Sequence, residues 1–222
     1  MPVISPVHNN KYIKLLLVIS IVFFVVMVCA FCLTAYAIVH HPQLHFDSNV
    51  FACLQTIRSA SMTHVMMVAT FLGSRYFLFP CYTVLVVYYL FFRKKLWFAV
   101  AIALTGFLGN QLLFFMQDVL HRQRPANPLI DYINGYSYPS GHSFASFTFA
   151  GLLSYLIWKK SFKTKWKITV AVISFVIAAI IAISRIYLRV HYPTDVLGGF
   201  YLSMIWLIPC LWILYLIDRM YL

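Results

Sequence analysis

The sequence predicts an all-α integral membrane protein with six transmembrane helices and an interfacial helical segment between the first and the second. Of the 222 residues, 63% are hydrophobic and 10% are charged, whereas charged residues make up about 25% of an ordinary soluble domain. Several apolar runs approach or exceed the ~20 residues that a helix needs to cross a bilayer. Because a lipid-exposed strand or loop cannot satisfy its backbone hydrogen bonds, we expect these runs to be helices.

The first apolar run, residues 15–39, is about 25 residues long, which is enough to cross the membrane with some tilt. Ala35 and Ala37 resemble a signal-peptidase site, but the run exceeds the roughly 7–15 residues of a signal-peptide core. We therefore expect a retained helix. The other predicted spans are residues 76–92, 97–117, 143–158, 168–186 and 196–217.

Residues 46–72 are apolar but are interrupted by polar and charged side chains. Asp47 is suited to the start of a helix. Val50, Phe51, Leu54 and Ile57 then recur at helical spacing. This pattern predicts an interfacial helix on the outer surface. Such a helix either packs against the bundle, which we favour, or borders the entrance of a site.

The basic residues explain the formal net charge of +12 without a nucleic-acid partner. Most lysines lie in short clusters between apolar runs, which is the positive-inside pattern of cytoplasmic loops. These clusters are Lys11 and Lys14, Arg93 to Lys95, and Lys159, Lys160, Lys163, Lys165 and Lys167. The pattern predicts cytoplasmic termini and places residues 40–75, 118–142 and 186–195 on the opposite side. We predict one membrane-embedded domain over residues 1–222, with its signature region at 117–195.

Three short strings carry polar and charged groups at or beside the ends of the predicted spans. They are Arg124-Pro125, then Pro139-Ser140-Gly141-His142, and then Ser184-Arg185 followed by His191 and Asp195. Ionisable groups at membrane depth are costly, so a function is their default explanation. The predicted topology gathers all three strings at one membrane face, which indicates a single site.

Arg124 and Arg185 are suited to hold a phosphate group, because a guanidinium makes paired, charge-assisted hydrogen bonds to its oxygens. Ser140, Gly141 and His142 directly precede an apolar run, so their N–H groups are expected at a helix N-terminus, which binds anions. The bland alternatives are an interfacial arginine and a simple serine cap. Two arginines beside Ser-Gly-His favour phosphate.

His191 and Asp195 complete the predicted chemistry. Pro193 suits the first turn of the last span, and Asp195 falls in that turn. The carboxylate is expected to accept a hydrogen bond from one ring nitrogen of His191 and so to direct the other nitrogen at phosphorus. His142 would then protonate the leaving oxygen and later activate water.

These strings resemble the type 2 phosphatidic-acid phosphatase superfamily, whose pattern is Lys-x6-Arg-Pro, Pro-Ser-Gly-His and Ser-Arg-x5-His-x3-Asp. The resemblance implies the helical core that these enzymes share with vanadium haloperoxidases. It implies that His191 forms a phosphohistidine, that Asp195 orients it and that His142 is the general acid. It also implies that Arg124, Ser140, Gly141 and Arg185 bind phosphate and that no metal or other cofactor is needed.

One position departs from the family pattern, because Gln117 stands where the family has lysine. We hypothesise that Gln117 binds phosphate as a neutral donor. A missing cation in a desolvated site costs a few kcal/mol of transition-state stabilisation. Arg122 or His121 are candidates to replace that charge, and Asp118 is a candidate to orient Arg122.

By this resemblance we expect metal-independent hydrolysis of a lipid phosphate monoester or diphosphate at the extracytoplasmic face of a bacterial inner membrane. Undecaprenyl diphosphate and phosphatidylglycerophosphate are the preferred substrates, and a lipid A phosphatase is the close alternative. A non-catalytic lipid-binding or transport protein of the same fold is the more distant one. The expected partners are the lipid substrate and the bilayer, and the sequence specifies no oligomeric state.

Overall fold

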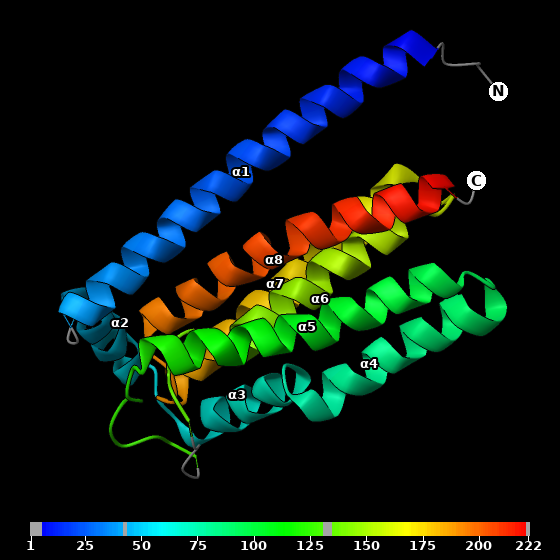
Figure 1. Ribbon diagram of the computed structural model, residues 1–222. Helices are drawn as coiled ribbons and strands as arrows, with labels where there is room; N and C mark the ends of the chain where they lie inside the picture. Colours follow the sequence, from blue (N-terminus) through cyan, green and yellow to red (C-terminus); the bar gives the residue numbers. More distant parts are fainter. Residues whose placement is uncertain (1–5, 42–43, 131–134, 221–222) are drawn as a thin grey trace.

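Helices form all of the regular structure in the computed structural model, which describes residues 6–41, 44–130 and 135–220 (Figure 1). The predicted all-α fold is therefore confirmed. In chain order the elements are α1 (Pro6–His40), α2 (His45–Thr56), α3 (Ala60–Leu72), α4 (Arg75–Val87), the π-helical η1 (Tyr88–Phe92), α5 (Leu96–Leu120), α6 (Gly141–Trp158), α7 (Thr164–Tyr187) and α8 (Pro193–Met220).

Within the described residues, five helical segments are long and apolar enough to cross a membrane. They are Ile13–His40, Ala60–Phe92, Leu96–Leu120, Thr164–Tyr187 and Pro193–Met220. The remaining predicted span, 143–158, lies in α6, which packs against α7 and α8. Ser143, Ser146 and Thr148 of α6 are buried. These hydroxyls lower the hydropathy of α6, and a helix that contacts protein on several sides does not need an apolar surface.

The segment predicted as one interfacial helix over 46–72 is helical, but it forms two helices, and the second of them, α3, is the first part of the candidate membrane span Ala60–Phe92. The first helix, α2, ends before Ser59. The side chain of Ser59 caps α3 by accepting a hydrogen bond from the Met62 N–H at 3.2 Å. α2 contacts α7 and α8, whereas α3 packs along α7 and leads directly into α4. At the α3–α4 junction a Cβ on Gly73 would lie 2.4 Å from Ile181 Cγ2. Glycine therefore allows this bend to press against α7.

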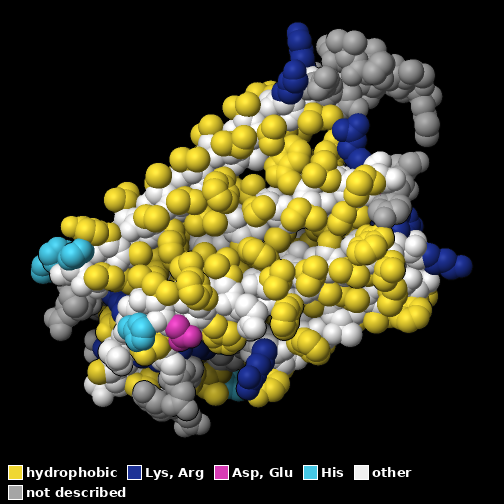
Figure 2. Space-filling view, in the orientation of Figure 1, with side chains coloured by type: hydrophobic (Ala, Val, Ile, Leu, Met, Phe, Trp, Pro, Cys, Tyr) yellow, Lys and Arg dark blue, Asp and Glu magenta, His cyan; other side chains and the backbone are white. Residues whose placement is uncertain are grey.

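The core of the bundle lies between α5, α6 and α8, where Ile102, Leu152 and Leu214 are fully buried. α1 leans on this bundle near its C-terminal end and diverges from it toward the N-terminus (Figure 1). Phe31 and Ile38 of α1 share a buried cluster with Leu113 and Leu202. Figure 2 shows hydrophobic side chains covering the middle of one face of the molecule, as a lipid-facing surface requires.

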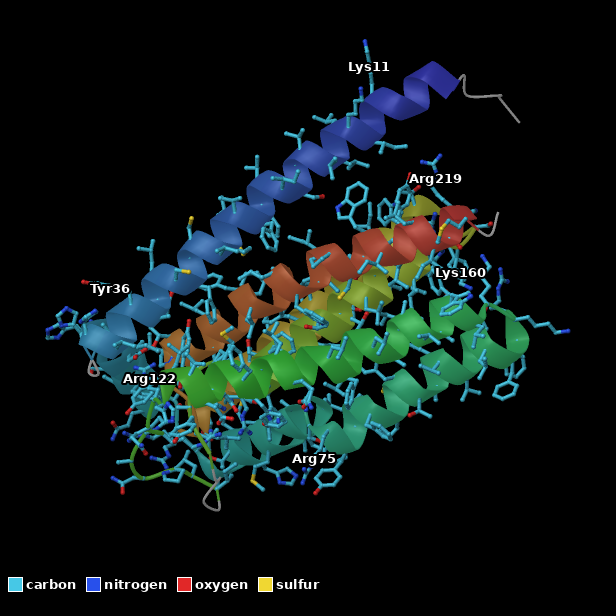
Figure 3. The ribbon with its side chains drawn as sticks, in the orientation of Figure 1. Lys11, Tyr36, Arg75, Arg122, Lys160 and Arg219 are labelled. Carbon is cyan, nitrogen blue, oxygen red and sulfur yellow. The ribbon has the colours of Figure 1, made fainter. Side chains whose placement is uncertain are left out.

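The two ends of the bundle differ in their chemistry. The N-terminal end of α1 and the C-terminal end of α8 lie at one end, where Asp218 pairs with Lys95 at 2.8 Å and also with Lys159 (Figure 1). The opposite end carries α2, the connection from α5 to α6 and the turn from α7 to α8 (Figure 1). Figure 3 shows Arg122 among many nitrogen- and oxygen-bearing side chains at this second end, far from Lys160. The sequence-predicted site residues therefore belong to one end of the bundle.

Candidate active site

The three predicted strings meet in the structure. Arg124 lies in the loop after α5, and its Nη1 is 3.2 Å from Nε2 of His191 in the α7–α8 turn. The backbone N–H of Ser140, at the start of α6, donates to the carbonyl oxygen of Asp195 at 2.9 Å. Arg185 lies in the last turn of α7 and is buried. Residues separated by up to about 70 positions along the chain thus form one polar cluster, as the sequence predicted.

The contacts of His191 fix its tautomer. Nδ1 lies 2.8 Å from the carbonyl oxygen of Ser137, which only accepts hydrogen bonds. Nε2 faces the guanidinium of Arg124, which only donates. The proton is therefore on Nδ1, and Nε2 carries the lone pair. Burial is the main cause that lowers the pKa of His191 to about 4, and Asp195 opposes this shift. The neutral imidazole, which is the nucleophilic form, is present at neutral pH.

Asp195 is fully buried in the first turn of α8, and its carboxylate accepts hydrogen bonds from several donors. Oδ1 accepts from Arg122 at 2.6 Å, while Oδ2 accepts from the Tyr192 N–H at 2.7 Å and from the Ser137 hydroxyl. Oδ2 lies 3.5 Å from Nδ1 of His191. The carboxylate of Asp195 thus lies close to Nδ1 of His191, while the shorter hydrogen bond of the imidazole goes to the Ser137 carbonyl.

The predicted phosphate-binding groups lie near this pair. The Ser140 hydroxyl is buried and has no hydrogen-bond partner within the described structure. Gly141 and His142 open α6, so their N–H groups have no acceptor inside the helix. Nη1 of Arg185 donates to the Thr70 hydroxyl at 2.6 Å, and no carboxylate of the described residues pairs with this guanidinium. A buried hydroxyl, free N–H groups and a buried cation together complement an anion.

Arg124 stands beside this anion site and contacts its surroundings through several bonds. Nε donates to the carbonyl oxygen of Gly135 at 3.0 Å, and Nη1 donates to that of Val190 at 2.9 Å. These bonds tie the loop after α5 to the α7–α8 turn. Arg124 and Arg185 are close enough for their charges to interact. Such like charges are stabilised when an anion binds between them.

His142 is half-buried in the first turn of α6. It lies within range of Coulombic interaction with Arg185, His191 and Arg124. Its ring also borders the α3–α4 junction, because Cδ2 would lie 3.1 Å from a Cβ on Gly73. His142 therefore shares the polar cluster with His191 but enters it from α6, whereas His191 enters it from the α7–α8 turn.

Gln117 contacts the second string. Its Nε2 donates to the carbonyl oxygen of Pro139 at 2.9 Å, so this side chain holds the loop that precedes α6. The amide has a second N–H, and its binding to phosphate remains a prediction.

The residues suggested as replacements for the family lysine are placed elsewhere. Arg122 is buried between Asp47 and Asp195, at 2.8 and 2.6 Å, so the suggestion that it supplies the missing phosphate charge was wrong. Asp118 is exposed and has no described contact with Arg122. His121 is also exposed, and its ring makes an edge-on contact with Tyr136 at a centroid distance of 4.4 Å.

Sequence reasoning missed the groups that support the histidine and its acid. Ser137 touches both His191 and Asp195, and Thr194 bridges Asp47 and Arg122. Asp47, whose position in the sequence suits the start of a helix, is buried with only 2% of its surface exposed. One signal was available, because a carboxylate in an apolar segment of a membrane protein is rare.

Close packing of α8 keeps Asp195 against the start of α6. A Cβ on Gly199 would lie 2.5 Å from the carbonyl oxygen of Ser140 and 2.9 Å from Cβ of Ser143. Only glycine allows this approach. The Ser143 hydroxyl adds a bond of 2.8 Å to the carbonyl oxygen of Val196. The spacing between the anion site and the His191–Asp195 pair is therefore set by backbone contact.

An all-helical membrane bundle with a buried histidine–aspartate pair beside an arginine-rich anion site defines a membrane-embedded enzyme that acts on phosphate esters. Residues 94–219 match the model of the PAP2 superfamily, and the chain belongs to this superfamily. The protein is a lipid phosphatase.

Individual relatives agree with this assignment. Phosphatidylglycerophosphatase B of Bacillus subtilis (strain 168) is 32% identical over 176 residues, which cover 79% of this chain and 86% of the relative. The putative undecaprenyl-diphosphatase YbjG of Escherichia coli (strain K12) is 41% identical over 69 residues, which cover 31% of this chain and 30% of the relative.

Two solved structures share the fold. The crystal structure of a transmembrane PAP2 type phosphatidylglycerolphosphate phosphatase from Bacillus subtilis has a TM-score of 0.76 and 29% identity, covering 89% of this chain and 95% of that chain. The crystal structure of Aquifex aeolicus LpxE has a TM-score of 0.59 and 25% identity, covering 76% and 96%. Each match covers a larger share of this chain than residues 94–219, so the likeness extends beyond the region that the family model matches.

Proposed function

We propose that this single membrane domain hydrolyses a lipid phosphate monoester or diphosphate through a phosphohistidine on Nε2 of His191, without a metal. One observation carries the proposal. Nδ1 of His191 is occupied by the Ser137 carbonyl, while the lone pair on Nε2 faces the arginine that borders the anion site. A nucleophile with this orientation needs no other group to remove a proton before it attacks.

The reaction has two steps. Nε2 of His191 attacks phosphorus, and the bond from phosphorus to the leaving oxygen breaks as protonated His142 donates a proton to that oxygen. Arg185, Arg124 and the N–H groups at the start of α6 bind the phosphoryl oxygens, and Asp195 stabilises the positive charge that develops on His191. Neutral His142 then takes a proton from water, which attacks phosphorus, breaks the bond to nitrogen and releases inorganic phosphate.

We place this site at the extracytoplasmic face of a bacterial inner membrane. The support is the distribution of charge, because the lysine clusters lie at the other end of the bundle, with Lys95 and Lys159 beside Asp218. A lipid can then diffuse laterally toward the site with its headgroup at the interface. A cysteine introduced at Asn127, in the loop after α5, should react with an impermeant thiol reagent from outside intact cells. Reaction only after permeabilisation would reverse the orientation.

The proposed substrates are phosphatidylglycerophosphate and undecaprenyl diphosphate. The relative with the greater coverage is a phosphatidylglycerophosphatase, and the shorter match is to a putative undecaprenyl-diphosphatase. A lipid A phosphatase is the alternative, because such enzymes carry the same motif pattern. A non-catalytic lipid-binding or transport role is disfavoured by the complete set of His142, His191 and Asp195.

The decisive experiment measures phosphate release by the purified protein in detergent with a chelator present. The panel contains phosphatidylglycerophosphate, isoprenyl diphosphate, phosphatidic acid and lipid A. We expect release from at least one lipid, inhibition by vanadate and trapping of an acid-labile phosphoenzyme that His191→Ala abolishes. Phosphate release from every substrate at the same rate in wild type and His191→Ala would overturn the mechanism.

A further inference from the structure

Arg122 is the centre of a buried network, and Asp195 is the member of it that the catalytic steps above use. Its guanidinium donates to Oδ2 of Asp47 at 2.8 Å and to Oδ1 of Asp195 at 2.6 Å. The Tyr192 ring covers one face of the guanidinium, with 4.1 Å between Cζ and the ring centroid. The side chains of Arg122, Asp47 and Asp195 are 6%, 3% and 0% exposed. Solvent therefore screens these charges very little.

Two hydrogen bonds from Thr194 fix the carboxylate of Asp47 in this network. Oδ1 accepts from the Thr194 N–H at 2.9 Å, and Oδ2 accepts from the Thr194 hydroxyl at 2.8 Å. The same hydroxyl accepts from Nη1 of Arg122 at 2.7 Å. Asp47 thereby joins α2 to the first turn of α8, one residue before Asp195. The arrangement aligns Arg122 without requiring any contact between Asp47 and the substrate.

Arg122 also reaches His191 by a second route, through its backbone. Its carbonyl oxygen accepts from the Ser137 N–H at 2.7 Å. The Ser137 carbonyl in turn accepts from Nδ1 of His191, and the Ser137 hydroxyl donates to Asp195. The position of Arg122 thus controls both groups that contact Nδ1.

The charges of the network have a definite consequence. With one arginine and two aspartates the sum is −1, so the positive charge of Arg122 is shared between two carboxylates. Without Asp47, Arg122 would pair with Asp195 alone and cancel its charge. A neutralised Asp195 would give little support to the positive charge that His191 acquires during attack on phosphorus.

We propose that Asp47 is a positioning residue for His191, because its pairing with Arg122 leaves the negative charge of Asp195 available to the imidazole. The inference rests on the proposed nucleophilic role of His191. It extends the site to α2, and it assigns Arg122 to charge balance around the nucleophile. Asp47 and Arg122 do not touch the phosphate in this scheme.

The test uses opposite changes of charge. Asp47→Asn keeps the shape of the side chain and raises the sum of charges to 0, while Arg122→Gln lowers it to −2. The double variant restores −1. The charged and titratable groups that face His191 are Asp195, Arg124, Arg185 and His142, and none of them is changed.

The readout is kcat/KM at pH 4 divided by kcat/KM at pH 6.5, on one lipid substrate in detergent. Dividing each variant's ratio by that of wild type cancels the ionisation of the substrate. Removing one buried charge from the network near His191 shifts the pKa of His191 by about one unit. The ratio should rise almost twofold in Asp47→Asn, fall about fivefold in Arg122→Gln and return to the wild-type value in the double variant.

The rate at pH 6.5 gives a second readout. We expect kcat of Asp47→Asn to fall up to about tenfold, because one pH unit of lost basicity weakens the nucleophile. KM should stay unchanged, since the phosphate-binding groups are intact. Asp47→Glu keeps the charge and should retain the wild-type ratio. Asp118→Asn is the matched control, because this carboxylate is exposed at the same end of the bundle and is screened by solvent.

Three results would count against the proposed role of Asp47 or against the mechanism on which it rests. Wild-type pH ratios in both single variants, or a double variant whose pH ratio does not return toward the wild-type value, would show a purely structural network and overturn the inference. If Asp47→Asn does not fold, the pH ratio of Arg122→Gln alone tests the inference. We expect Arg122→Gln to fold, because Asp47 keeps its donor from Thr194 and Asp195 keeps its donors from Tyr192 and Ser137. Full activity in His191→Ala would instead refute the proposed mechanism, so the two failures are distinguishable.

Discussion

Replacement of Gln117 tests how the protein functions without the lysine of the family pattern. In the structure its Nε2 holds the Pro139 carbonyl at 2.9 Å, directly before the Ser140–His142 turn. Gln117→Leu removes this donor at similar volume. An intramolecular hydrogen bond contributes about 1 kcal/mol, which corresponds to a factor of roughly five in rate. If Gln117 only holds the loop, kcat/KM should therefore fall about fivefold.

A direct role in phosphate binding predicts a larger effect. A second lost hydrogen bond of about 1 kcal/mol would bring the total loss for Gln117→Leu to roughly 25-fold. Gln117→Lys should keep kcat/KM at or above the wild-type value, because an ammonium can also donate to the Pro139 carbonyl and adds a charge that attracts phosphate. Vanadate should bind this variant more tightly than wild type.

The assay is phosphate release in detergent, with the inhibition constant of vanadate measured in parallel. Gln123→Leu is the matched control, because Gln123 is exposed in the loop after α5. It should behave as wild type. If Gln117→Leu and Gln117→Lys both stay within twofold of wild type in kcat/KM and in vanadate affinity, Gln117 neither holds the loop nor binds phosphate, and the reasoning is refuted.

Three further predictions concern packing, charge geometry and pH. Gly199→Ala places a Cβ 2.5 Å from the Ser140 carbonyl, so we expect a lower Tm in detergent and more than tenfold lower activity; an unchanged Tm would contradict this. Arg185→Lys keeps the charge but loses the planar fork, so kcat/KM and vanadate affinity should both fall more than tenfold; an effect on kcat/KM alone would contradict a role in binding. Because neutral His191 attacks and its pKa is about 4, the acidic limb of kcat/KM, corrected for substrate ionisation and fitted apart from the alkaline limb that deprotonation of His142 sets, should have its midpoint near pH 4; an acidic midpoint near 6.5 would contradict the burial argument.

The meeting of the three strings was predictable from the sequence because it follows from membrane topology. Ser140 and His142 precede one apolar run, Arg185 ends another and Asp195 begins the next. Helices that cross a bilayer must place such ends at its faces. Three further spans of sufficient length then fix which ends share a face. The contact between Ser140 and the backbone of Asp195 is the close-range result of that arrangement.

The roles of the individual arginines could not be predicted in the same way. Arg122 and Arg124 are two positions apart, yet the first binds carboxylates and the second borders the nucleophile. The difference comes from Asp47, which is 75 residues from Arg122 along the chain. Such pairing depends on how α2 packs against α8, and hydropathy patterns do not encode that packing. The same limit hid the contact between Arg185 and Thr70 of α3.

Residues before position 94 therefore help to position groups of the site, although they lie outside the region that the family model matches. Asp47 of α2 aligns Arg122, and Thr70 of α3 aligns Arg185. Thr70 thus contacts a motif residue directly, while Asp47 acts on the motif residue Asp195 through Arg122. Asp47 and Thr70 themselves come from elements that the motifs do not cover. A shift of α2 or α3 would thus change the geometry of the anion site without any change in the sequence of the motifs. For this reason we expect differences in substrate preference between members with identical motifs to follow the sequence and packing of these two helices.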